Sequence, residues 1–325
     1  YNHWESRKVV DTNITDRSGL LSLEIPVMTS NMDTITEVDM ANFIRSKGGV
    51  GVLHRFMSIE ENVKMLGVCN SPVFVSVGCS EEDLQRAEAL RDANAGFFCI
   101  DVAHAPAKYV GRPLKNLREM LGKGACIMAG NVATYAGADY LASCGADIIK
   151  VGIGGGSVCT TRIKTGFGVP NLTAIKDCTR VDRSVVADGG IRNPGDIVKA
   201  LAFGADFVMI GSMLAGTRPT PGKVITRTTE SGQELKFKMY RGMASSEVHE
   251  DYHGGLADWK TAEGVSMEVE YRETEEIIIA DIVGGLRSGM TYAGAASISE
   301  LQRKLDYVRI TNAARIENLP HRTMH

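Results

Sequence analysis

Eight short apolar runs recur along the chain and alternate with segments of helical spacing. Each run is apolar over four to seven positions, which is typical of a strand buried on both faces. The runs lie at 25–30, 48–54, 72–78, 96–103, 124–130, 146–154, 184–190 and 205–212. The helical segments between them lie at 36–47, 58–67, 80–93, 108–121, 134–144 and 194–203. Eight strand–helix units predict a (β/α)8 TIM barrel.

An open doubly wound sheet is the alternative to this barrel. Such a sheet needs fewer strand–helix units, and its dinucleotide fingerprint is a GxGxxG turn with an acidic residue about 20 positions later. No run of this chain opens a helix with that fingerprint. The pattern therefore favours the barrel.

Residues 213–274 interrupt the rhythm of the chain. They are polar and carry three alternating segments, KVITRT, LKFKMYRG and SMEVEYRE, which predict a hairpin or flap after the eighth strand. At the carboxyl side of the strands, such a flap is expected to act as a lid over a barrel site. Helical character returns at 275–304. We therefore expect one (β/α)8 domain over 1–325, with the flap at 213–274 inserted in it.

Composition limits the class of protein. Of the 325 residues, 44% are hydrophobic and 23% are charged, which excludes a disordered chain. The net charge of −3 argues against a broadly basic nucleic-acid-binding protein. No apolar run reaches the roughly 18 residues of a membrane span. We therefore expect neither a nucleic acid nor a membrane as a partner.

The chain opens on Tyr1 without a signal peptide, and we expect an N-terminal piece to precede it.

The seven cysteines are odd in number and include no CxxC pair. They predict free thiols in a reducing cytoplasm rather than a disulfide framework or a zinc site. Cys159 stands apart because it follows a glycine-rich loop and is close in sequence to Arg162. A thiol beside a guanidinium can be nucleophilic, since positive charge favours the thiolate. A buried cysteine in a tight turn is the alternative interpretation.

Glycine-rich loops follow the sixth, seventh and eighth runs. The loop 154–157 offers backbone amides to a phosphate or carbonyl oxygens to a cation. Gly189–Gly190 and Gly211–Ser212 fall at the usual phosphate site of a TIM barrel, after strands seven and eight. Asp188 could bind a ribose diol or cap the following turn. Because the two loops repeat the same chemistry, they favour a phosphorylated ligand.

Several motifs together resemble the IMP dehydrogenase/GMP reductase family. They are GSVCTTR at 156–162, NMDT at 31–34, AGNVAT at 129–134, ADGGIRNPGD at 187–196, MYRGM at 239–243 and VGGLRSGMTYAGA at 283–295. The resemblance covers essentially the whole chain, and GSVCTTR in a barrel context is highly specific. It implies an oxidoreductase whose cysteine adds to C2 of a purine nucleotide.

Carried over motif by motif, the resemblance implies roles for individual residues. Cys159 would be the nucleophile. The ribose phosphate would be held by Ser157, Asp188, Gly189, Gly190, Gly211 and Ser212. Arg241, Gly242 and Met243 would face the purine. The backbone of Gly154, Gly156 and Cys159 would bind a monovalent cation such as K+.

The resemblance also separates two activities. IMP dehydrogenases oxidise IMP with NAD and usually activate water with an Arg-Tyr pair in the flap, whereas GMP reductases convert GMP and NADPH to IMP and ammonia. This chain contains no Arg-Tyr dipeptide. The stretch between His54 and Phe74 has room for one helix but not for the CBS modules of most dehydrogenases.

Two segments resemble the reductases in particular. They are TGFG at 165–168 and the GGLA…AEG pattern at 254–264, by which Thr161 and Glu263 would form a proton-transfer pair. We therefore expect an NADPH-dependent GMP reductase. An IMP dehydrogenase without CBS modules is the alternative, and a nucleotide-binding barrel without turnover is a third hypothesis. Asp101 and Asn131 would lie near the nicotinamide.

Other expectations concern the assembly and three departures from the family pattern. In the homotetramer typical of the family, Tyr292 would reach a neighbouring subunit's cofactor. Gly155 stands where the family usually has proline, which gives the loop more freedom. Arg55 follows His54 where reductases have lysine. Lys260 replaces an arginine expected to contact the guanine or its phosphate, and keeps the charge without the fork geometry.

Overall fold

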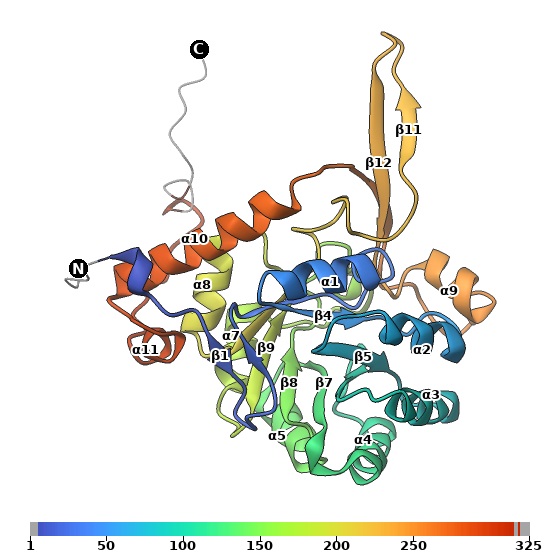
Figure 1. Cartoon of the computed structure of the whole chain (residues 1–325), viewed down its shortest axis with the longest axis horizontal. Helices are drawn as coiled ribbons and strands as arrows, with labels where there is room; N and C mark the ends of the chain where they lie inside the picture. The colour runs from blue at the N-terminus through green and yellow to red at the C-terminus, as the bar shows by residue number, and fades with distance from the viewer. Residues whose placement is uncertain (1–5, 315–317, 319–325) are drawn as a thin grey trace.

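Eight parallel strands close into a barrel in the computed structural model, which describes residues 6–314 and residue 318 (Figure 1). In chain order the strands are β3 (Val27–Thr29), β4 (Val50–Leu53), β5 (Val73–Val77), β6 (Phe97–Asp101), β7 (Cys126–Val132), β8 (Ile148–Val151), β9 (Ser184–Asp188) and β10 (Phe207–Ile210). The ring closes where β10 pairs with β3, with Met209 opposite Met28. Each predicted run overlaps one of these strands, so the TIM barrel is confirmed and the open sheet was the wrong alternative.

Successive side chains of each strand alternate between the barrel interior and the surface that the helices cover. On β8, Ile148 packs among the interior side chains, whereas Ile149 and Val151 pack with the apolar faces of the helices. On β9, Val186 faces the interior and Val185 faces the helices. Because both faces are buried, the strands appear in the sequence as continuous apolar runs rather than alternating ones.

Helices surround the barrel and connect its strands. They are α1 (Val38–Ser46), α2 (Ile59–Gly67), α3 (Glu81–Asp92), α4 (Lys108–Leu121), α5 (Tyr135–Ser143), α7 (Asn171–Cys178), α8 (Pro194–Ala202) and α10 (Glu275–Ala293). Shorter elements are η1 (Arg7–Val9), η2 (Gly122–Gly124), α6 (Thr161–Thr165) and α11 (Ile298–Arg303). The unusually long interval after the sixth run holds α6 and a loop ahead of α7. Among the described residues, no helix combines the length and apolarity that crossing a bilayer requires.

Local signals in the sequence start several helices. The side chain of Ser58 accepts from the backbone N–H of Glu61, whose carboxylate accepts in return from the N–H of Ser58. Ser80 and Asp83 form the same reciprocal pair at the start of α3. Such capping boxes satisfy backbone donors that a helix leaves unpaired at its N-terminus. They fix the residue at which each of these helices begins.

A small hairpin closes the amino-terminal end of the barrel. It is made by β1 (Ile14–Thr15) and β2 (Ser22–Leu23), which pair antiparallel. Leu21 and Leu23 are 0% and 2% exposed and join the apolar side chains of the barrel interior. The hairpin therefore plugs the end opposite the carboxyl ends of the strands.

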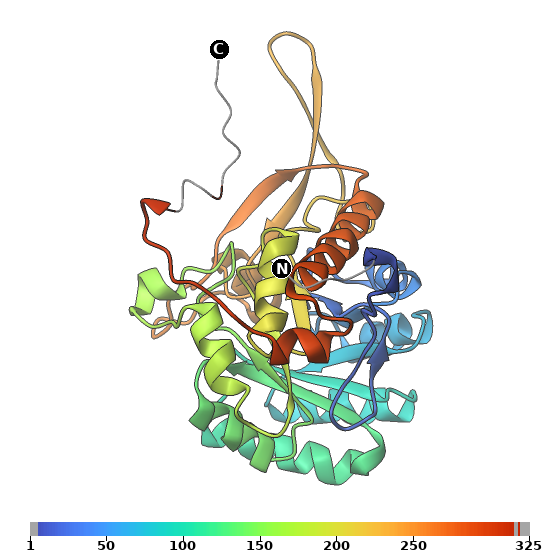
Figure 2. The same ribbon diagram turned by 90° about the vertical axis from the view of Figure 1, so that its left-hand side faces the viewer.

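The flap forms a second, three-stranded antiparallel sheet of β11 (Ile225–Thr228), β12 (Glu234–Arg241) and β13 (Ser266–Glu270). These strands lie in the three alternating segments. The β11–β12 hairpin projects away from the barrel rather than over it (Figures 1 and 2). Helix α9 (Ser246–His253) and the loop to β13 follow the base of β12. The hairpin therefore does not cover the barrel, and the lid predicted for the flap stays a prediction for its base alone.

We expect Leu21→Ala to lower the free energy of unfolding by about 2–5 kcal/mol, because truncation leaves a cavity in the barrel interior. Urea denaturation measures this loss. Leu235→Ala on β12 is the control, since Leu235 is 37% exposed and its truncation should cost about 0.5 kcal/mol or less. Equal losses for the two variants would contradict the role of the plug.

Candidate active site

A cavity of about 560 Å³ opens at the carboxyl ends of the barrel strands. The barrel supplies residues from seven strands or the loops after them, and the flap supplies residues 240, 242–244, 249, 260 and 263. The predicted residues that line it are Asp101, Asn131, Gly154, Gly156, Ser157, Cys159, Thr161, Asp188, Gly189, Gly190, Gly211, Ser212, Gly242, Met243, Lys260 and Glu263. Segments far apart in the sequence therefore meet at one site. Arg241 and Tyr292 do not line it.

The loop after β8 places Cys159 between the barrel and the flap. Its half-buried thiol donates to Thr161 Oγ1, with 3.2 Å between sulfur and oxygen. Cys159 forms an antiparallel bridge with Gly264, and the backbone N–H of Thr160 donates to the carbonyl oxygen of Glu263 at 2.8 Å. The three residues predicted for catalysis are therefore brought together, although they come from opposite sides of the cavity.

The guanidinium expected beside the thiol lies elsewhere. Arg162 is exposed, and its Nη2 donates to the carbonyl oxygen of Val169 at 2.8 Å. Its aliphatic stem packs where Gly154 and Gly168 have no Cβ. Proximity in sequence misled here because Arg162 lies in α6, whose first turn directs its side chain away from the cavity. The argument that Arg162 activates Cys159 is therefore wrong.

Burial makes several of the other thiols weak acids. All seven thiols are free. Burial raises the pKa of Cys99 and of Cys178 to about 12, and it raises the pKa of Cys69 to about 11. These thiols stay protonated at neutral pH and act as small apolar side chains.

Gly155 is held in place by Asn171 rather than being left free. A Cβ on Gly155 would lie 2.5 Å from Asn171 Oδ1. The side-chain amide of Asn171 donates to the carbonyl oxygens of Asp188, at 3.3 Å, and of Gly189. Asn171 thus fills the space that a larger residue at 155 would need and ties the two glycine loops together. The expected gain in loop freedom is not seen.

Two hydroxyls flank the glycine loops. Ser157 Oγ and the phenol oxygen of Tyr240 are 2.8 Å apart, and both residues line the cavity. Tyr240 is 4% exposed, and burial raises the pKa of its phenol. A neutral phenol can donate a hydrogen bond to an anionic group. Sequence analysis included Tyr240 only as part of the MYRGM motif, and it missed this position in the cavity.

A buried lysine forms the floor of the cavity. Lys150 is 2% exposed, and its Nζ donates to Asp101 Oδ1 at 2.5 Å and to Asp188 Oδ2 at 3.4 Å. In the strand register, Gly130 of β7 lies between Asp101 of β6 and Lys150 of β8. A Cβ on Gly130 would lie 2.5 Å from the Cβ of Lys150. The missing side chain therefore makes room for the lysine.

The ion pairs outweigh the cost of burial at this floor. Burial lowers the pKa of the Lys150 ammonium, but the charges of Asp101 and Asp188 raise it above its ordinary value. Burial raises the pKa of the Asp101 carboxyl, and Lys150 lowers it below its ordinary range. Lys150 and Asp101 are consequently both charged at neutral pH. Sequence analysis missed Lys150, although a lysine inside an apolar strand is itself a signal.

Asn131 completes the hold on Asp188. Its Nδ2 donates to Asp188 Oδ2 at 2.8 Å and to the carbonyl oxygen of Gly152 at 2.7 Å. Lys150 contacts the same carboxylate oxygen, so Asp188 Oδ1 takes part in neither of these two contacts. The side-chain oxygen of Asn131 is buried and has no hydrogen-bond partner among the described residues. An acceptor of this kind beside a cavity suits a ligand that carries an N–H or O–H donor.

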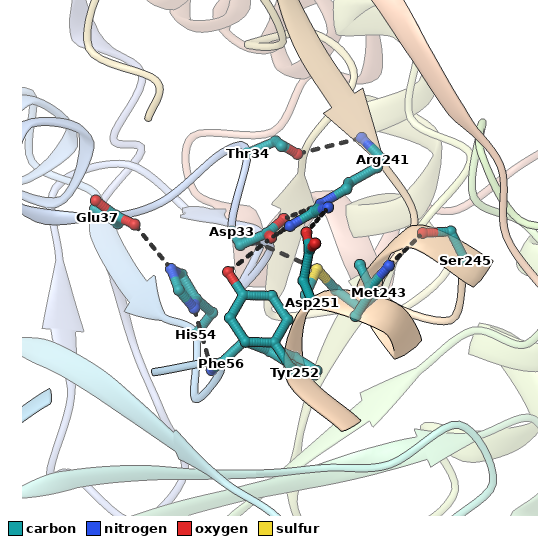
Figure 3. A network of polar contacts seen from close by, with 11 residues as sticks. Asp33, Thr34, Glu37, His54, Phe56, Arg241, Met243, Ser245, Asp251 and Tyr252 are labelled. Carbon is teal, nitrogen blue, oxygen red and sulfur yellow. Dashed lines mark hydrogen bonds and ion pairs between the residues drawn. The ribbon is translucent and has the colours of Figure 1, made fainter. Parts of the chain in front are cut away.

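Arg241 does not face the purine position that was predicted for it. Its guanidinium contacts Asp33, with Nε at 3.0 Å from Oδ2, and its Nη1 contacts Asp251 Oδ2 at 2.6 Å (Figure 3). Two carboxylates hold the guanidinium outside the cavity, which corrects the prediction. Gly242 and Met243, which follow Arg241, do line the cavity.

The remaining predicted residues lie at the edge of the site or away from it. Lys260 lines the cavity, and its Nζ is 4.9 Å from the centroid of the Trp259 ring. Arg55 also lines it, stacked over Phe56 with Nη1 at 3.7 Å from Asp83 Oδ1. Tyr292 is 68% exposed near the end of α10.

The described residues hold no cluster of three or more His, Cys, Asp or Glu side chains suited to a metal ion. The loop predicted to bind a monovalent cation offers backbone carbonyl oxygens instead. The carbonyl oxygen of Gly156 accepts from the N–H of Cys159 at 3.2 Å, and it keeps a second lone pair. Carbonyl oxygens without a carboxylate fit a weakly bound cation of single charge.

A TIM barrel whose cavity joins a cysteine loop to a flap and to glycine-rich loops defines a nucleotide-binding enzyme class. The family model described as IMP dehydrogenase / GMP reductase domain matches residues 3–321. The chain belongs to this family, as the motifs indicated.

Individual relatives carry both activities in their names. The chain is 38% identical to GMP reductase 1 of Mus musculus and 36% identical to GMP reductase 2 of Homo sapiens, with 88% of this chain aligned to 84% and 83% of theirs. A crystal structure titled inosine 5′-monophosphate dehydrogenase from Legionella pneumophila is 69% identical, with a TM-score of 0.88 over 97% of this chain and 96% of that one. A GMP reductase variant from Trypanosoma brucei, in complex with guanosine 5′-monophosphate, is 28% identical with a TM-score of 0.90, over 100% and 96% of the chains.

In the Lys150→Met variant we expect the ionisation of Asp101 to destabilise the fold, whereas in the wild type it stabilises the fold. In the wild type the folded pKa of Asp101 is below its unfolded value, so its ionisation stabilises the fold above about pH 4. Without Lys150, burial raises the folded pKa above the unfolded value, and stability falls as pH rises. We expect the loss to reach about 3–5 kcal/mol at pH 8 and to be smaller at pH 5, measured by urea unfolding.

Lys238→Met is the matched control for that prediction. Lys238 is 4% exposed, and its Nζ donates to the carbonyl oxygens of Thr217, Arg218 and Thr220. Carbonyl oxygens do not titrate, so this variant should lose similar stability at pH 5 and pH 8. A loss at Lys150 that does not grow with pH would show that the two carboxylates do not depend on it.

Proposed function

We propose that the protein is a GMP reductase, which converts GMP and NADPH to IMP, ammonia and NADP+. The observation that carries the proposal is the meeting of Cys159, Thr161 and Glu263 at one cavity, with the cysteine loop bridged to the flap. Loss of ammonia from C2 needs a nucleophile that adds and a group that delivers a proton to the amine. These three residues supply both functions.

The nucleotide would lie between the glycine loops and the flap. Gly189, Gly190, Gly211 and Ser212 offer backbone amides to the phosphate, and Ser157 with Tyr240 offers hydroxyls. Asp188 Oδ1 would accept from the ribose diol, because Lys150 and Asn131 hold the other oxygen. Gly242 and Met243 would face the base, with Lys260 at the edge of the cavity.

Chemistry would proceed in two steps. Cys159 Sγ would add to C2 of GMP while its proton passes through Thr161 to Glu263, and Glu263 would give a proton to the amine, which leaves C2 as ammonia. NADPH, when bound, would supply a hydride to C2 and leave as NADP+. The C–S bond would then break with its electron pair on sulfur, which releases IMP, and the Cys159 thiolate would take up a proton from solvent. Asp101 and the unpaired oxygen of Asn131 would orient the nicotinamide, and a K+ ion would be held by the carbonyl oxygens of Gly154, Gly156 and Cys159.

IMP dehydrogenase is the second candidate, favoured by the 69% identity to the Legionella pneumophila chain. That reaction needs a group that activates water. Arg241 is held by Asp33 and Asp251, and Arg272 donates to the carbonyl oxygens of Met213 and Ala215. Arg55 and Lys260 line the cavity, but within the described part of the chain neither is seen paired with a tyrosine. These contacts support the reductase.

Assembly and compartment belong to the same proposal. We infer a cytoplasmic homotetramer of barrels that lack CBS modules, in which the exposed Tyr292 would reach a neighbouring subunit's cofactor. The free state of the seven cysteines supports a reducing compartment. Sedimentation of the purified protein tests the assembly, and a species of monomeric mass would overturn it.

The purified enzyme should consume NADPH when given GMP and K+, with one ammonia released for each NADPH oxidised. The absorbance of the reduced nicotinamide and an ammonia assay measure this ratio. Glu263→Gln should lower kcat by about 100-fold or more, because the proton donor to the amine is lost. Glu250→Gln on α9, which does not line the cavity, should leave kcat unchanged. Formation of NADH from IMP and NAD, without NADPH consumption, would establish the dehydrogenase instead.

A further inference from the structure

Arg241 joins three parts of the molecule that are distant in sequence. It lies at the end of β12 and contacts Asp33, in the loop after β3, and Asp251 of α9 (Figure 3). Its Nε is 3.3 Å from Asp33 Oδ1 and 3.0 Å from Oδ2, and its Nη2 also donates to Oδ2. Charge-assisted contacts of a guanidinium with both oxygens of a carboxylate fix orientation as well as distance.

The loop that follows Arg241 is held to the barrel by two further contacts. The backbone N–H of Arg241 donates to Thr34 Oγ1 at 3.3 Å, and the N–H of Asp33 donates to Met243 Sδ at 3.4 Å. Residues 242–244 line the cavity. The contacts of Arg241, Thr34 and Met243 therefore determine where this part of the cavity wall lies relative to the barrel.

Helix α9 is attached to the same group of residues. Ser245, which is 0% exposed, caps α9 and donates its backbone N–H to the carbonyl oxygen of Gly242 at 3.0 Å. At the other end of α9, the phenol of Tyr252 donates to Asp33 Oδ2 at 3.4 Å, and its ring lies 5.5 Å from that of Phe56 (Figure 3). A shift of α9 would therefore move the loop 242–244 through Ser245.

We propose that Asp33, Arg241 and Asp251 form a clamp that positions the loop 242–244 for the purine base, which makes Arg241 a positioning residue. The proposal rests on the proposed function for the identity of the ligand. The clamp has a fixed side and a side that can open. The side chain of Asp33 is 4% exposed, whereas that of Asp251 is 54% exposed. Salt weakens an exposed ion pair more than a buried one, so the contact with Asp251 is the one that opens first.

Asp251→Asn tests the side that opens. Calorimetry with GMP should show a dissociation constant raised about threefold to tenfold, the range expected for loss of one charged hydrogen bond at a partly exposed site. KM for GMP should rise in the same proportion while kcat stays within about twofold, since no reacting group moves. Added salt should weaken GMP binding less in this variant than in the wild type. Asp251→Glu should restore most of the affinity.

Glu268→Gln is the matched control. It removes the carboxylate that binds Arg227 through two contacts in the same flap sheet, and Glu268 does not line the cavity. Its dissociation constant for GMP should equal that of the wild type. Equal weakening in the control and in Asp251→Asn would mean that the flap sheet responds to any lost ion pair, and would overturn the clamp.

Arg241→Met completes a double-mutant cycle. This variant should weaken GMP binding by about tenfold or more. Adding Asp251→Asn to it should weaken binding no further, because Arg241→Met has already removed the contact between Arg241 and Asp251. Additive effects would overturn the clamp. Wild-type protein that binds neither GMP nor IMP would overturn the clamp together with the proposed function, whereas variants that bind GMP as tightly as the wild type would overturn the clamp alone.

Discussion

The closed ring of eight strands is the constraint on which the rest of the structure depends. Its interior has no access to solvent through a sheet edge, so every inward side chain must be packed or paired. The amino-terminal plug and the apolar side chains meet this need over most of the ring. Near the carboxyl ends the interior becomes polar, and Lys150 is buried there with Asp101 and Asp188. The same charges that the fold must balance become the floor of the cavity.

The cavity has two halves, one from the barrel and one from the flap. Strand ends and the glycine loops supply the barrel half, which Asn171 and Asn131 tie together through hydrogen bonds to neighbouring loops. The flap supplies the other half at its base, where Glu263 and the loop 242–244 reach the cysteine loop. Loops that close over an active site commonly hold the substrate against a fixed scaffold. The division of this cavity between the barrel and the flap fits that arrangement.

The sequence predicts the barrel because strands buried on both faces leave a continuous apolar run, and Ser58, Ser80 and Asn193 mark where helices begin. Motifs locate most of the cavity for a similar reason, since they fall at strand ends, which a barrel gathers on one side. Side-chain direction is a different matter. The MYRGM motif places the backbone at 242–243, but the direction of Arg241 depends on Asp33, more than 200 residues earlier. The position of Lys150 could be predicted only from the strand register, because the space for its side chain is left by Gly130 on the neighbouring strand.

The direction of the reaction is decided by the geometry around Cys159 rather than by the overall sequence identity. The 69% identity to a chain titled as a dehydrogenase is a value for the whole alignment and does not single out the residues around Cys159. In the proposed mechanism, the direction depends on whether water or hydride reaches C2 after Cys159 has added to it. The chain has two tyrosine–arginine dipeptides, at 240–241 and 271–272. Arg241 forms an ion pair with Asp33, and Arg272 donates to backbone carbonyl oxygens. A guanidinium held by two carboxylates stays protonated, because their charges raise its pKa further despite burial, and it cannot act as a base. Thr161 Oγ1 accepts from the Cys159 thiol, and the backbone of Glu263 accepts from Thr160, so these two residues remain the acid–base pair of the proposed reductase.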